Sequence, residues 1–143
     1  MKQTAIAVLG GDRRMDFAAC ELARLGFDVR QWGRHQEDDA VAFSQCAREW
    51  LVDVDVLMLP LPTSVDGTHL HTPLCGSEEG LRIETLVSIA PHALWLVGRF
   101  NETLRLRADK EGIRWVDYFD TELLQLKNAL PTAEGAIEIA MHA

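Results

Sequence analysis

Residues 4–11 read Thr-Ala-Ile-Ala-Val-Leu-Gly-Gly, a continuous apolar run closed by two glycines. This pattern is typical of a strand buried on both faces of a parallel sheet, where helices cover it from both sides. The next segment, residues 13–25, carries Met, Ala and Leu side chains at helical spacing, and Gly26 ends it as a C-terminal cap. The opening of the chain therefore predicts the strand–turn–helix unit of an α/β protein.

The same alternation continues along the chain. Further strands are predicted over residues 27–32, 54–59, 93–97 and 113–118, and helices over 38–50, 81–89, 101–110, 121–127 and 132–141. Residues 61–80 read as a long loop, and loops of this length are usually functional or mobile. Strands that alternate with helices demand right-handed crossovers. We expect a flavodoxin/Rossmann-like α/β fold, a doubly wound parallel five-stranded sheet that binds ligands where its strands end.

The composition is that of one compact globular domain, with 143 residues, 48% hydrophobic and 25% charged. A formal net charge of −8 disfavours a nucleic-acid partner. No apolar stretch approaches the length of a membrane span, and the run at residues 1–9 is too short for a signal peptide. We therefore expect a cytoplasmic protein without a nucleic-acid or membrane partner.

Cysteine and histidine spacing argues against a metal. Cys20, Cys46 and Cys75 are odd in number and lack C-x-x-C spacing, which disfavours a disulfide framework and a structural zinc site. We interpret them as reduced thiols, with Cys20 buried on the first helix. His69 and His71 lie two apart, as metal ligands can. Without a third ligand, we interpret them as solvent-exposed loop histidines.

The turn after the first strand, Gly10, Gly11, Asp12 and Arg13, is the first candidate site. Glycines at a strand-to-helix turn expose backbone N–H groups beside the positive end of the helix, and such turns bind anions. The third glycine of G-x-G-x-x-G is missing here, and no acidic residue ends the second strand. A tight turn with Asp12 capping the helix is favoured over nucleotide binding, and a small carboxylate fits either interpretation.

Two more candidate sites follow other strands. Pro60, Pro62, Thr63 and Ser64 leave the third strand at the edge where such sheets bind ligands. Arg99 follows the fourth strand, and an arginine there can hold a carboxylate through two parallel hydrogen bonds. An ordinary surface arginine explains Arg99 equally well. The spacing identifies no catalytic residue, since no Ser-His-Asp or Cys-His arrangement stands out.

Residues 128–137 read Asn-Ala-Leu-Pro-Thr-Ala-Glu-Gly-Ala-Ile. Thr132 can cap a final helix, whose dipole favours Glu134 in the first turn. This accounts for Pro131 as well and leaves Asn128 unexplained. The helix runs to the end of the chain without a C-cap and with an apolar stripe uncovered. Either another molecule covers it, for which we expect a homo-oligomer, or the chain is a fragment.

This string resembles one in the dipicolinate synthase A-subunit family, where it joins two domains. Residues 6–14, Ile-Ala-Val-Leu-Gly-Gly-Asp-Arg-Arg, are similar to the family's opening I-A-V-I-G-G-D-x-R. The loop after the third strand, from Met58, and the pair Tyr118-Phe119 resemble the family too. One departure is that residues 120–122 read Asp-Thr-Glu, where the family usually has an arginine between two acidic residues.

The resemblance implies an N-terminal α/β domain over residues 1–127 and the start of an interdomain hinge helix over 128–143. It implies a sporulation oxidoreductase that makes dipicolinate from a dihydrodipicolinate-type precursor with NAD(P), beside a smaller B subunit. NAD(P) would lie on a C-terminal domain absent from this chain and not on the chain itself. The chain would be the substrate-side domain for a small dicarboxylate, inert in isolation.

In such a sheet all strands end on one side, so residues 10–13, 60–64, Arg99 and 128–134 are expected to line one cleft. The alternative is a stand-alone, non-catalytic α/β domain that binds a small acid or a protein partner. A reading frame that continues into a strand and G-x-G-x-x-G would discriminate in favour of the enzyme.

Overall fold

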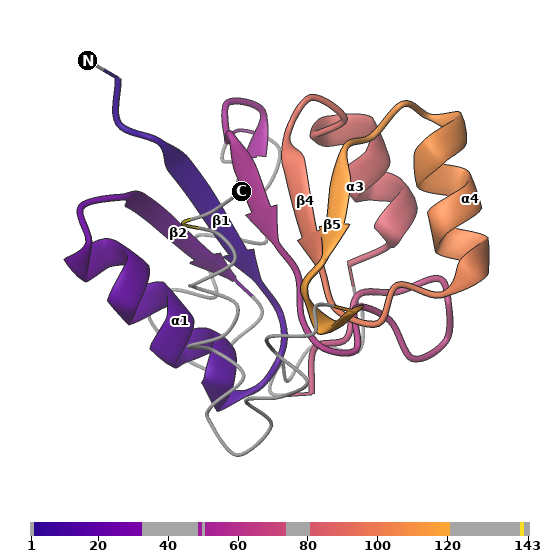
Figure 1. The fold of residues 1–143 in the computed structure, drawn as a ribbon, viewed down its shortest axis with the longest axis horizontal. Coiled ribbons are helices and arrows are strands. Elements are labelled where there is room, and N and C mark those ends of the chain that lie inside the picture. Colours follow the sequence, from indigo (N-terminus) through magenta and orange to yellow (C-terminus); the bar gives the residue numbers. More distant parts are fainter. Residues whose placement is uncertain (1, 33–48, 50, 74–80, 121–140, 142–143) are drawn as a thin grey trace.

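The computed structural model describes residues 2–32, 49, 51–73, 81–120 and 141. Five parallel strands form one sheet in the order β2-β1-β3-β4-β5 (Figure 1). Their bounds are β1 Ala5–Leu9, β2 Asp28–Trp32, β3 Val56–Met58, β4 Leu94–Val97 and β5 Trp115–Asp117. This order and the parallel pairing confirm the predicted flavodoxin-like, doubly wound sheet.

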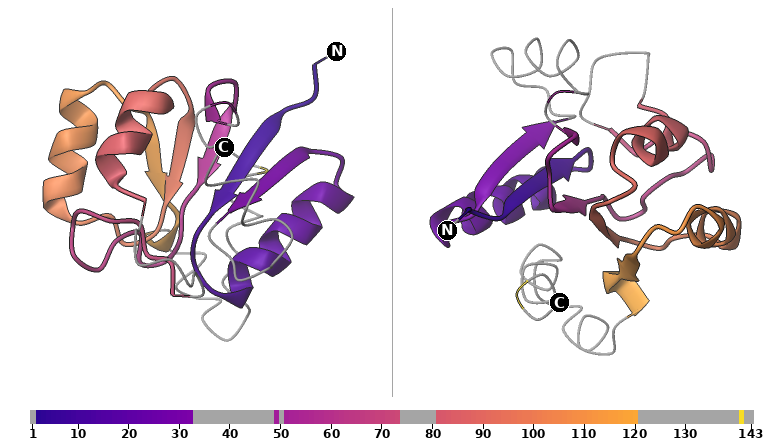
Figure 2. Two further views of the ribbon diagram at one scale, coloured as in Figure 1. Left: turned by 180° about the vertical axis from the view of Figure 1, so that it is seen from behind. Right: turned by 90° about the horizontal axis from the view of Figure 1, so that it is seen from above.

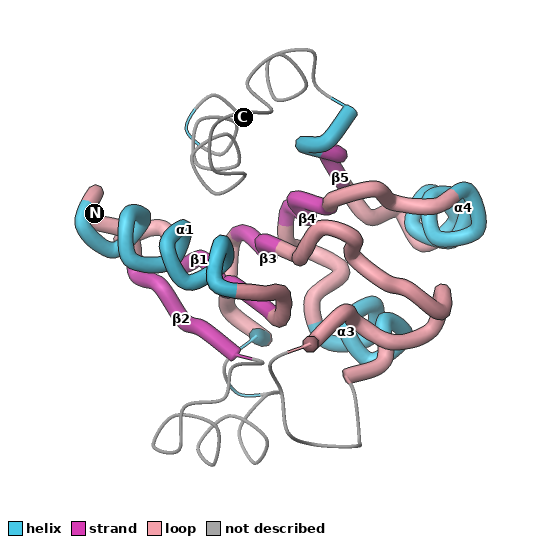
Figure 3. Tube along the Cα trace, turned by 90° about the horizontal axis from the view of Figure 1, so that it is seen from below, coloured by secondary structure: helices cyan, strands magenta, loops and turns pink. Residues whose placement is uncertain are grey.

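Helices cover the two faces of the sheet. Helix α1 (Arg13–Arg24) packs on one face, and α3 (Ile83–Ile89) and α4 (Glu102–Lys110) pack on the other (Figure 2, Figure 3). A short 3₁₀ turn, η1 (Tyr118–Asp120), follows β5. The sheet is thus enclosed between two apolar layers, as parallel sheets require.

Strand β1 shows why its sequence is apolar without interruption. All five of its residues are buried. Ala5, Ala7 and Leu9 belong to the core under α3 and α4, whereas Ile6 and Val8 belong to the core under α1. Because successive side chains of a strand point to opposite faces, a strand covered on both faces has no position for a polar side chain.

Helix α1 confirms its predicted limits and corrects two details. Its buried residues are Met15, Ala18, Ala19 and Leu22. Cys20 is exposed, so the prediction that it is buried is wrong, because it lies beside this stripe on the solvent side of the helix. Leu25, included in the predicted stripe, is 47% exposed as the residue that ends the helix.

Helices α1 and α4 each begin with a side-chain N-terminal cap, and the cap at Asp12 confirms a prediction. The Asp12 carboxylate accepts from the Arg14 N–H at 2.9 Å and begins α1. The Asn101 side-chain oxygen accepts from the Leu104 N–H at 2.9 Å and begins α4. Each side chain satisfies one backbone N–H that has no partner within its own helix.

Several predictions lie outside the described residues. They are the helix over 121–127, nearly all of the helices over 38–50 and 132–141, the string from Asn128, and Cys46 and Cys75. Within the described part of the chain, no helix is both long and apolar enough to cross a membrane.

Candidate functional site

The loops that leave the strands at their carboxyl ends are hydrogen-bonded to one another; we call this side of the sheet the carboxyl edge. The Gly11 N–H after β1 donates to the His71 carbonyl at 2.9 Å, and the His71 N–H donates to the Thr63 carbonyl at 2.9 Å. The Thr63 N–H donates to the carbonyl of Gly98, after β4, at 2.8 Å. Segments far apart in the sequence therefore form one connected surface, at the lower side of Figure 1.

Thr63 is the polar centre of this surface and is 0% exposed. Its hydroxyl accepts from the Gly98 N–H at 2.9 Å and lies within hydrogen-bonding distance of two carbonyls, those of Pro60 (3.1 Å) and Gly98 (3.0 Å). A hydroxyl has one proton, so it donates to one of these carbonyls at a time. Thr63, which was predicted to contact a ligand, is thus a buried side chain that links the loop after β3 to the loop after β4.

The neighbouring prolines and serine have similar roles. Pro60 is buried, and Pro62 is half-buried after a cis peptide bond with Leu61. The Ser64 hydroxyl donates to the His69 carbonyl at 2.5 Å and accepts from the Gly67 N–H at 2.9 Å. Ser64 therefore closes the loop that follows β3.

The glycine turn after β1 is built by close packing. The Gly10 N–H donates to the Trp32 carbonyl at 2.7 Å, and the Gly11 N–H goes to His71. The prediction that these two N–H groups are exposed is therefore wrong. A Cβ on Gly10 would lie 2.7 Å from the His71 carbonyl oxygen, and one on Gly11 would lie 2.4 Å from Met15 Cγ. Both glycines have positive φ, so close packing and backbone conformation each favour glycine at these two positions.

Charge at this turn comes from Asp12, Arg13 and Arg14. Arg14 Nε lies 3.0 Å from the Asp12 carboxylate, and Arg14 Nη2 donates to the Leu61 carbonyl at 3.3 Å. Burial raises the pKa of the Asp12 carboxyl, but its hydrogen bonds with Arg14 outweigh burial and hold the pKa below its usual value. Arg13 is exposed in the first turn of α1.

Asp117, at the end of β5, organises the loop after β4. Its side chain is 2% exposed. Oδ1 accepts from the backbone N–H groups of Arg99 (3.2 Å) and Phe119 (3.0 Å). Oδ2 accepts from the Phe100 N–H (2.8 Å) and from Arg105 Nη2 (3.3 Å). Four donors thus surround one buried carboxylate, and sequence reasoning missed it because the strand prediction treated Asp117 as one more strand residue.

Arg99 itself is exposed and has an unusual backbone. Its φ is +50°, the left-handed region that side chains other than glycine seldom occupy. Its guanidinium carbon lies over the Phe119 ring, 4.5 Å from the centroid, within the range of a cation–π contact. Among the described residues, no carboxylate pairs with this guanidinium.

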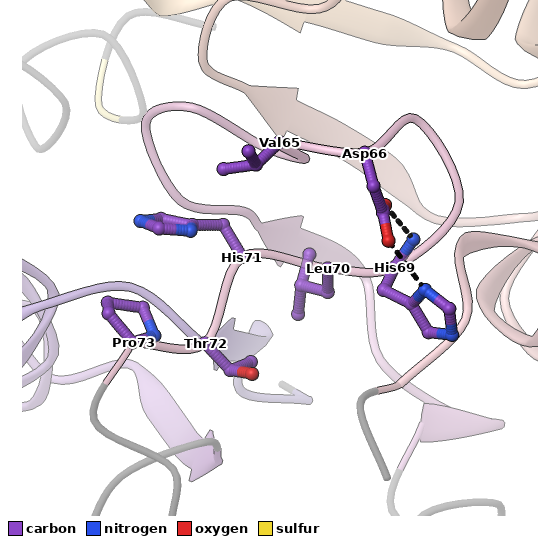
Figure 4. Close-up of a pocket in the computed structure, with 7 residues that line it drawn as sticks. All are labelled: Val65, Asp66, His69, Leu70, His71, Thr72 and Pro73. Atoms are coloured by element: carbon purple, nitrogen blue, oxygen red, sulfur yellow. Dashed lines mark hydrogen bonds and ion pairs between the residues drawn. The ribbon is translucent and has the colours of Figure 1, made fainter. Parts of the chain in front are cut away.

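A pocket of about 320 Å³ lies beside the β3 loop, outside the predicted residues (Figure 4). Its lining comprises Val65, Asp66, His69, Leu70, His71, Thr72 and Pro73. Both histidines are half-buried as whole residues, and the His69 side chain is 43% exposed. Figure 4 shows their imidazoles pointing to opposite sides of Leu70. In the part of the chain that is described, no group of three or more His, Cys, Asp or Glu side chains could hold a metal ion.

Asp66 fixes the pocket's rim. Its carboxylate accepts from the backbone N–H groups of Thr68 (2.8 Å) and His69 (2.7 Å) and lies 2.8 Å from His69 Nδ1. These hydrogen bonds, the backbone ones first, hold the pKa of Asp66 well below its usual range. With Nδ1 facing a carboxylate, neutral His69 carries its proton there and leaves Nε2 as an acceptor.

The predicted site residues are thus brought together in part. A Cβ on Gly11 would lie 3.0 Å from Pro60 Cβ, and a Cβ on Gly98 would lie 2.9 Å from Leu61 Cβ. Asn128, Pro131, Thr132 and Glu134 lie outside the described residues. The common cleft with the terminal string stays a prediction.

The chain matches a family model and resembles solved structures. The family model for the N-terminal domain of the dipicolinate synthase A subunit matches residues 5–119. The A chain of dipicolinate synthase from Bacillus subtilis superposes with a TM-score of 0.71, at 23% identity over 99% of this chain and 49% of that one. The dipicolinate synthase A subunit from Bacillus halodurans gives 0.70, at 20% identity over 97% and 48%.

At these identities the solved structures show the likeness of fold alone. The chain spans about half the length of each, 49% and 48%. Among curated proteins, none matches the sequence.

Proposed function

Because the chain belongs to the family of dipicolinate synthase A-subunit N-terminal domains, we propose that it is the substrate-side domain of an NAD(P)-dependent oxidoreductase. The substrate is a dihydrodipicolinate-type dicarboxylate, which the complete enzyme oxidises to dipicolinate during sporulation. The observation that carries this proposal is the family match, which begins at residue 5 with β1 and ends at residue 119, just after β5. The match thus spans the whole sheet and its carboxyl edge.

The glycine turn supports a cofactor site outside this chain. A dinucleotide pyrophosphate needs free N–H groups and open space at the turn after β1. The Gly10 and Gly11 N–H groups donate to carbonyls of this chain, and the His71 carbonyl and Met15 lie where any Cβ would stand. The residues at this turn therefore do not fit the pyrophosphate of a dinucleotide. In the proposal NAD(P) therefore binds a C-terminal domain, and this chain supplies no step that involves it.

Exposed arginines at the carboxyl edge support a dicarboxylate ligand. Arg13 begins α1 and Arg99 follows β4, so each presents a guanidinium beside the ends of the strands. An arginine binds a carboxylate through two parallel, charge-assisted hydrogen bonds. In a chain with a net charge of −8, a local cationic site of this kind is what an acidic ligand requires.

The proposal also includes the string at residues 128–137 and the protein partners. In this proposal Asn128, Pro131, Thr132 and Glu134 also belong to the substrate site, as the family resemblance implies. The proposed protein partners are a second copy of this chain, in a homo-oligomer, and a B subunit.

Two measurements test the proposed function. Titration calorimetry of the chain with NAD and NADP should show no binding at sub-millimolar concentrations. Addition of pyridine-2,6-dicarboxylate should shift amide NMR signals of residues 10–13, 61, 63–64 and 98–101 and leave those at the opposite edge unchanged. A micromolar isotherm with either nucleotide would contradict the assignment, as would shifts confined to the opposite edge.

A further inference from the structure

We propose that Asp117 and Phe119 are positioning residues that hold the Arg99 guanidinium as a preformed receptor for one carboxylate of the ligand. The inference rests on the proposed function for the class of ligand. It assigns a role to Asp117, the last residue of β5, and to Phe119 just after it, and it explains the backbone of Arg99.

One carboxylate oxygen connects the cation with the ring beneath it. Asp117 Oδ1 accepts the backbone N–H of Arg99 at 3.2 Å and the backbone N–H of Phe119 at 3.0 Å. The two residues come from different strand ends, yet both main chains are fixed to the same atom. The position of the guanidinium over the ring is therefore set by the backbone as well as by the side chains.

The left-handed backbone of Arg99 is a second sign of constraint. A side chain other than glycine at φ +50° is disfavoured and persists only where the surroundings over-determine it. Here the Asp117 carboxylate holds the backbone in this conformation by accepting hydrogen bonds from the N–H groups of Arg99 and Phe100. Glycine would adopt this backbone without strain, whereas arginine adopts it at a conformational cost.

The contact with Phe119 leaves N–H donors of the guanidinium for an anion. The guanidinium carbon lies over the ring, 4.5 Å from its centroid. A guanidinium carries several N–H groups, so it can bind a carboxylate through two of them while its carbon stays over the ring. The ring also restricts the rotamers that an exposed arginine otherwise samples, which lowers the cost of ordering it on binding.

Asp117 does not compete with the ligand for this cation. Its side chain is 2% exposed, and its oxygens accept from three backbone N–H groups and from Arg105. Arg105 in turn donates to the Phe100 carbonyl at 2.7 Å and lies over Trp115. The buried negative charge is thus compensated locally, and the Arg99 guanidinium remains available to an incoming anion.

The test is an NMR titration of the full 143-residue chain with pyridine-2,6-dicarboxylate. Phe119→Leu keeps an apolar side chain and removes the aromatic face, so affinity should fall about two- to fivefold, the range of an exposed cation–π contact. Phe119→Tyr keeps the face and should bind within about twofold of the unchanged chain. Arg99→Lys loses the planar fork and should weaken binding at least as much as Phe119→Leu.

Matched controls lie elsewhere on the domain. Arg114 is an exposed arginine that precedes β5 at the opposite edge, and Phe17 is an exposed phenylalanine on α1. Arg114→Lys and Phe17→Leu should leave the affinity unchanged. The melting temperature of each variant separates a loss of binding from a loss of folding. In the unchanged chain, Arg99 side-chain protons should show a ring-current shift and should move on titration, a readout that needs no variant.

The outcomes separate the inference from the function. If Arg99→Lys weakens binding and Phe119→Leu does not, Arg99 binds without its platform and the inference is overturned, while the proposed function stands. If Arg114→Lys weakens binding as much as Arg99→Lys, general electrostatics explains the effect and the inference is again overturned. If the unchanged chain shows no shifts with the dicarboxylate, the proposed ligand class fails as well.

Discussion

The Tyr118 hydroxyl donates a hydrogen bond of 2.8 Å to the Leu59 carbonyl, across 59 positions of the sequence. The contact joins the end of β5 to the end of β3 and passes directly beside β4. A Cβ on Gly98 would lie 2.8 Å from the same hydroxyl, so no larger residue fits between the two. The contact thus ties the edge strand β5 to the central strand β3 just where the carboxyl edge begins.

Replacement of Tyr118 by Phe should destabilise the domain by about 1–3 kcal/mol, because the buried Leu59 carbonyl loses its donor. Urea denaturation followed by tryptophan fluorescence gives the free energy of unfolding. Ser88→Ala is the control, since the exposed Ser88 hydroxyl donates to the Glu84 carbonyl on the helix surface. A cost for Tyr118→Phe no larger than for Ser88→Ala would contradict the role of the contact.

Tyr118 should stay protonated as long as the domain is folded. Burial raises the pKa of its phenol above the usual value of about 10. A raised folded pKa means that the stabilising contribution is complete below the unfolded pKa and is lost as the pH rises above it. The chain has one tyrosine, so tyrosinate absorbance near 295 nm reports this group alone. Ionisation near pH 10 in a chain with native circular dichroism would refute the prediction.

Thr63→Val should cost about 1–3 kcal/mol, since it leaves the buried Gly98 N–H without its side-chain acceptor while the volume hardly changes. Thr68→Val is the matched control on the same loop, because Thr68 is exposed and donates only its backbone N–H to Asp66. Chemical denaturation of both variants gives the comparison. Equal costs would show that the Thr63 hydroxyl is not a structural link.

Gly11→Ala should destabilise the domain more than Gly112→Ala. Both glycines have positive φ, +78° and +72°, so the backbone strain of an alanine is shared by the two variants. A Cβ on Gly112 meets nothing within 4 Å, whereas one on Gly11 lies 2.4 Å from Met15 Cγ. Overpacking of this kind costs about 1–3 kcal/mol, which is the expected difference between the two melting experiments.

The Asp66 carboxyl should titrate well below its usual pKa of about 3.9, because N–H groups of Thr68 and His69 bind the ionised form. With a depressed folded pKa, its contribution to stability is present above the unfolded pKa and is lost as the pH falls. A pH series of carboxyl ¹³C NMR spectra gives the midpoint. A midpoint near 4 would mean that these hydrogen bonds do not persist in solution.

The fold was predictable because burial on two faces leaves a plain signal in the sequence. Residues 54–59 and 113–118 predicted strands, and the structure has Val56–Met58 and Trp115–Asp117 within them. The predicted ranges are longer because an apolar run includes flanking residues, such as Leu59 and Ile113, that belong to the core and not to a strand. The pattern of apolar residues in the sequence indicates which residues are buried. The limits of a strand depend instead on its hydrogen-bonded partners elsewhere in the chain.

The site was less predictable because its decisive contacts join distant residues. The glycines at positions 10 and 11 suggested free N–H groups, and only the fold shows that Trp32 and His71 accept from them. The importance of Asp117 likewise depends on which N–H groups surround it in three dimensions. The position of Arg99 at the carboxyl edge, in contrast, was predictable from its place after a strand, because all parallel strands end on one side.

The hydrogen bonds from Gly11 to His71, from His71 to Thr63 and from Thr63 to Gly98 continue the network of the sheet into its loops. We therefore expect these loop N–H groups to belong to the same cooperative unit as the strands and to undergo hydrogen exchange only when that unit opens. A ligand that reaches this edge therefore meets a preorganised surface, and ordering the protein costs little of its binding free energy.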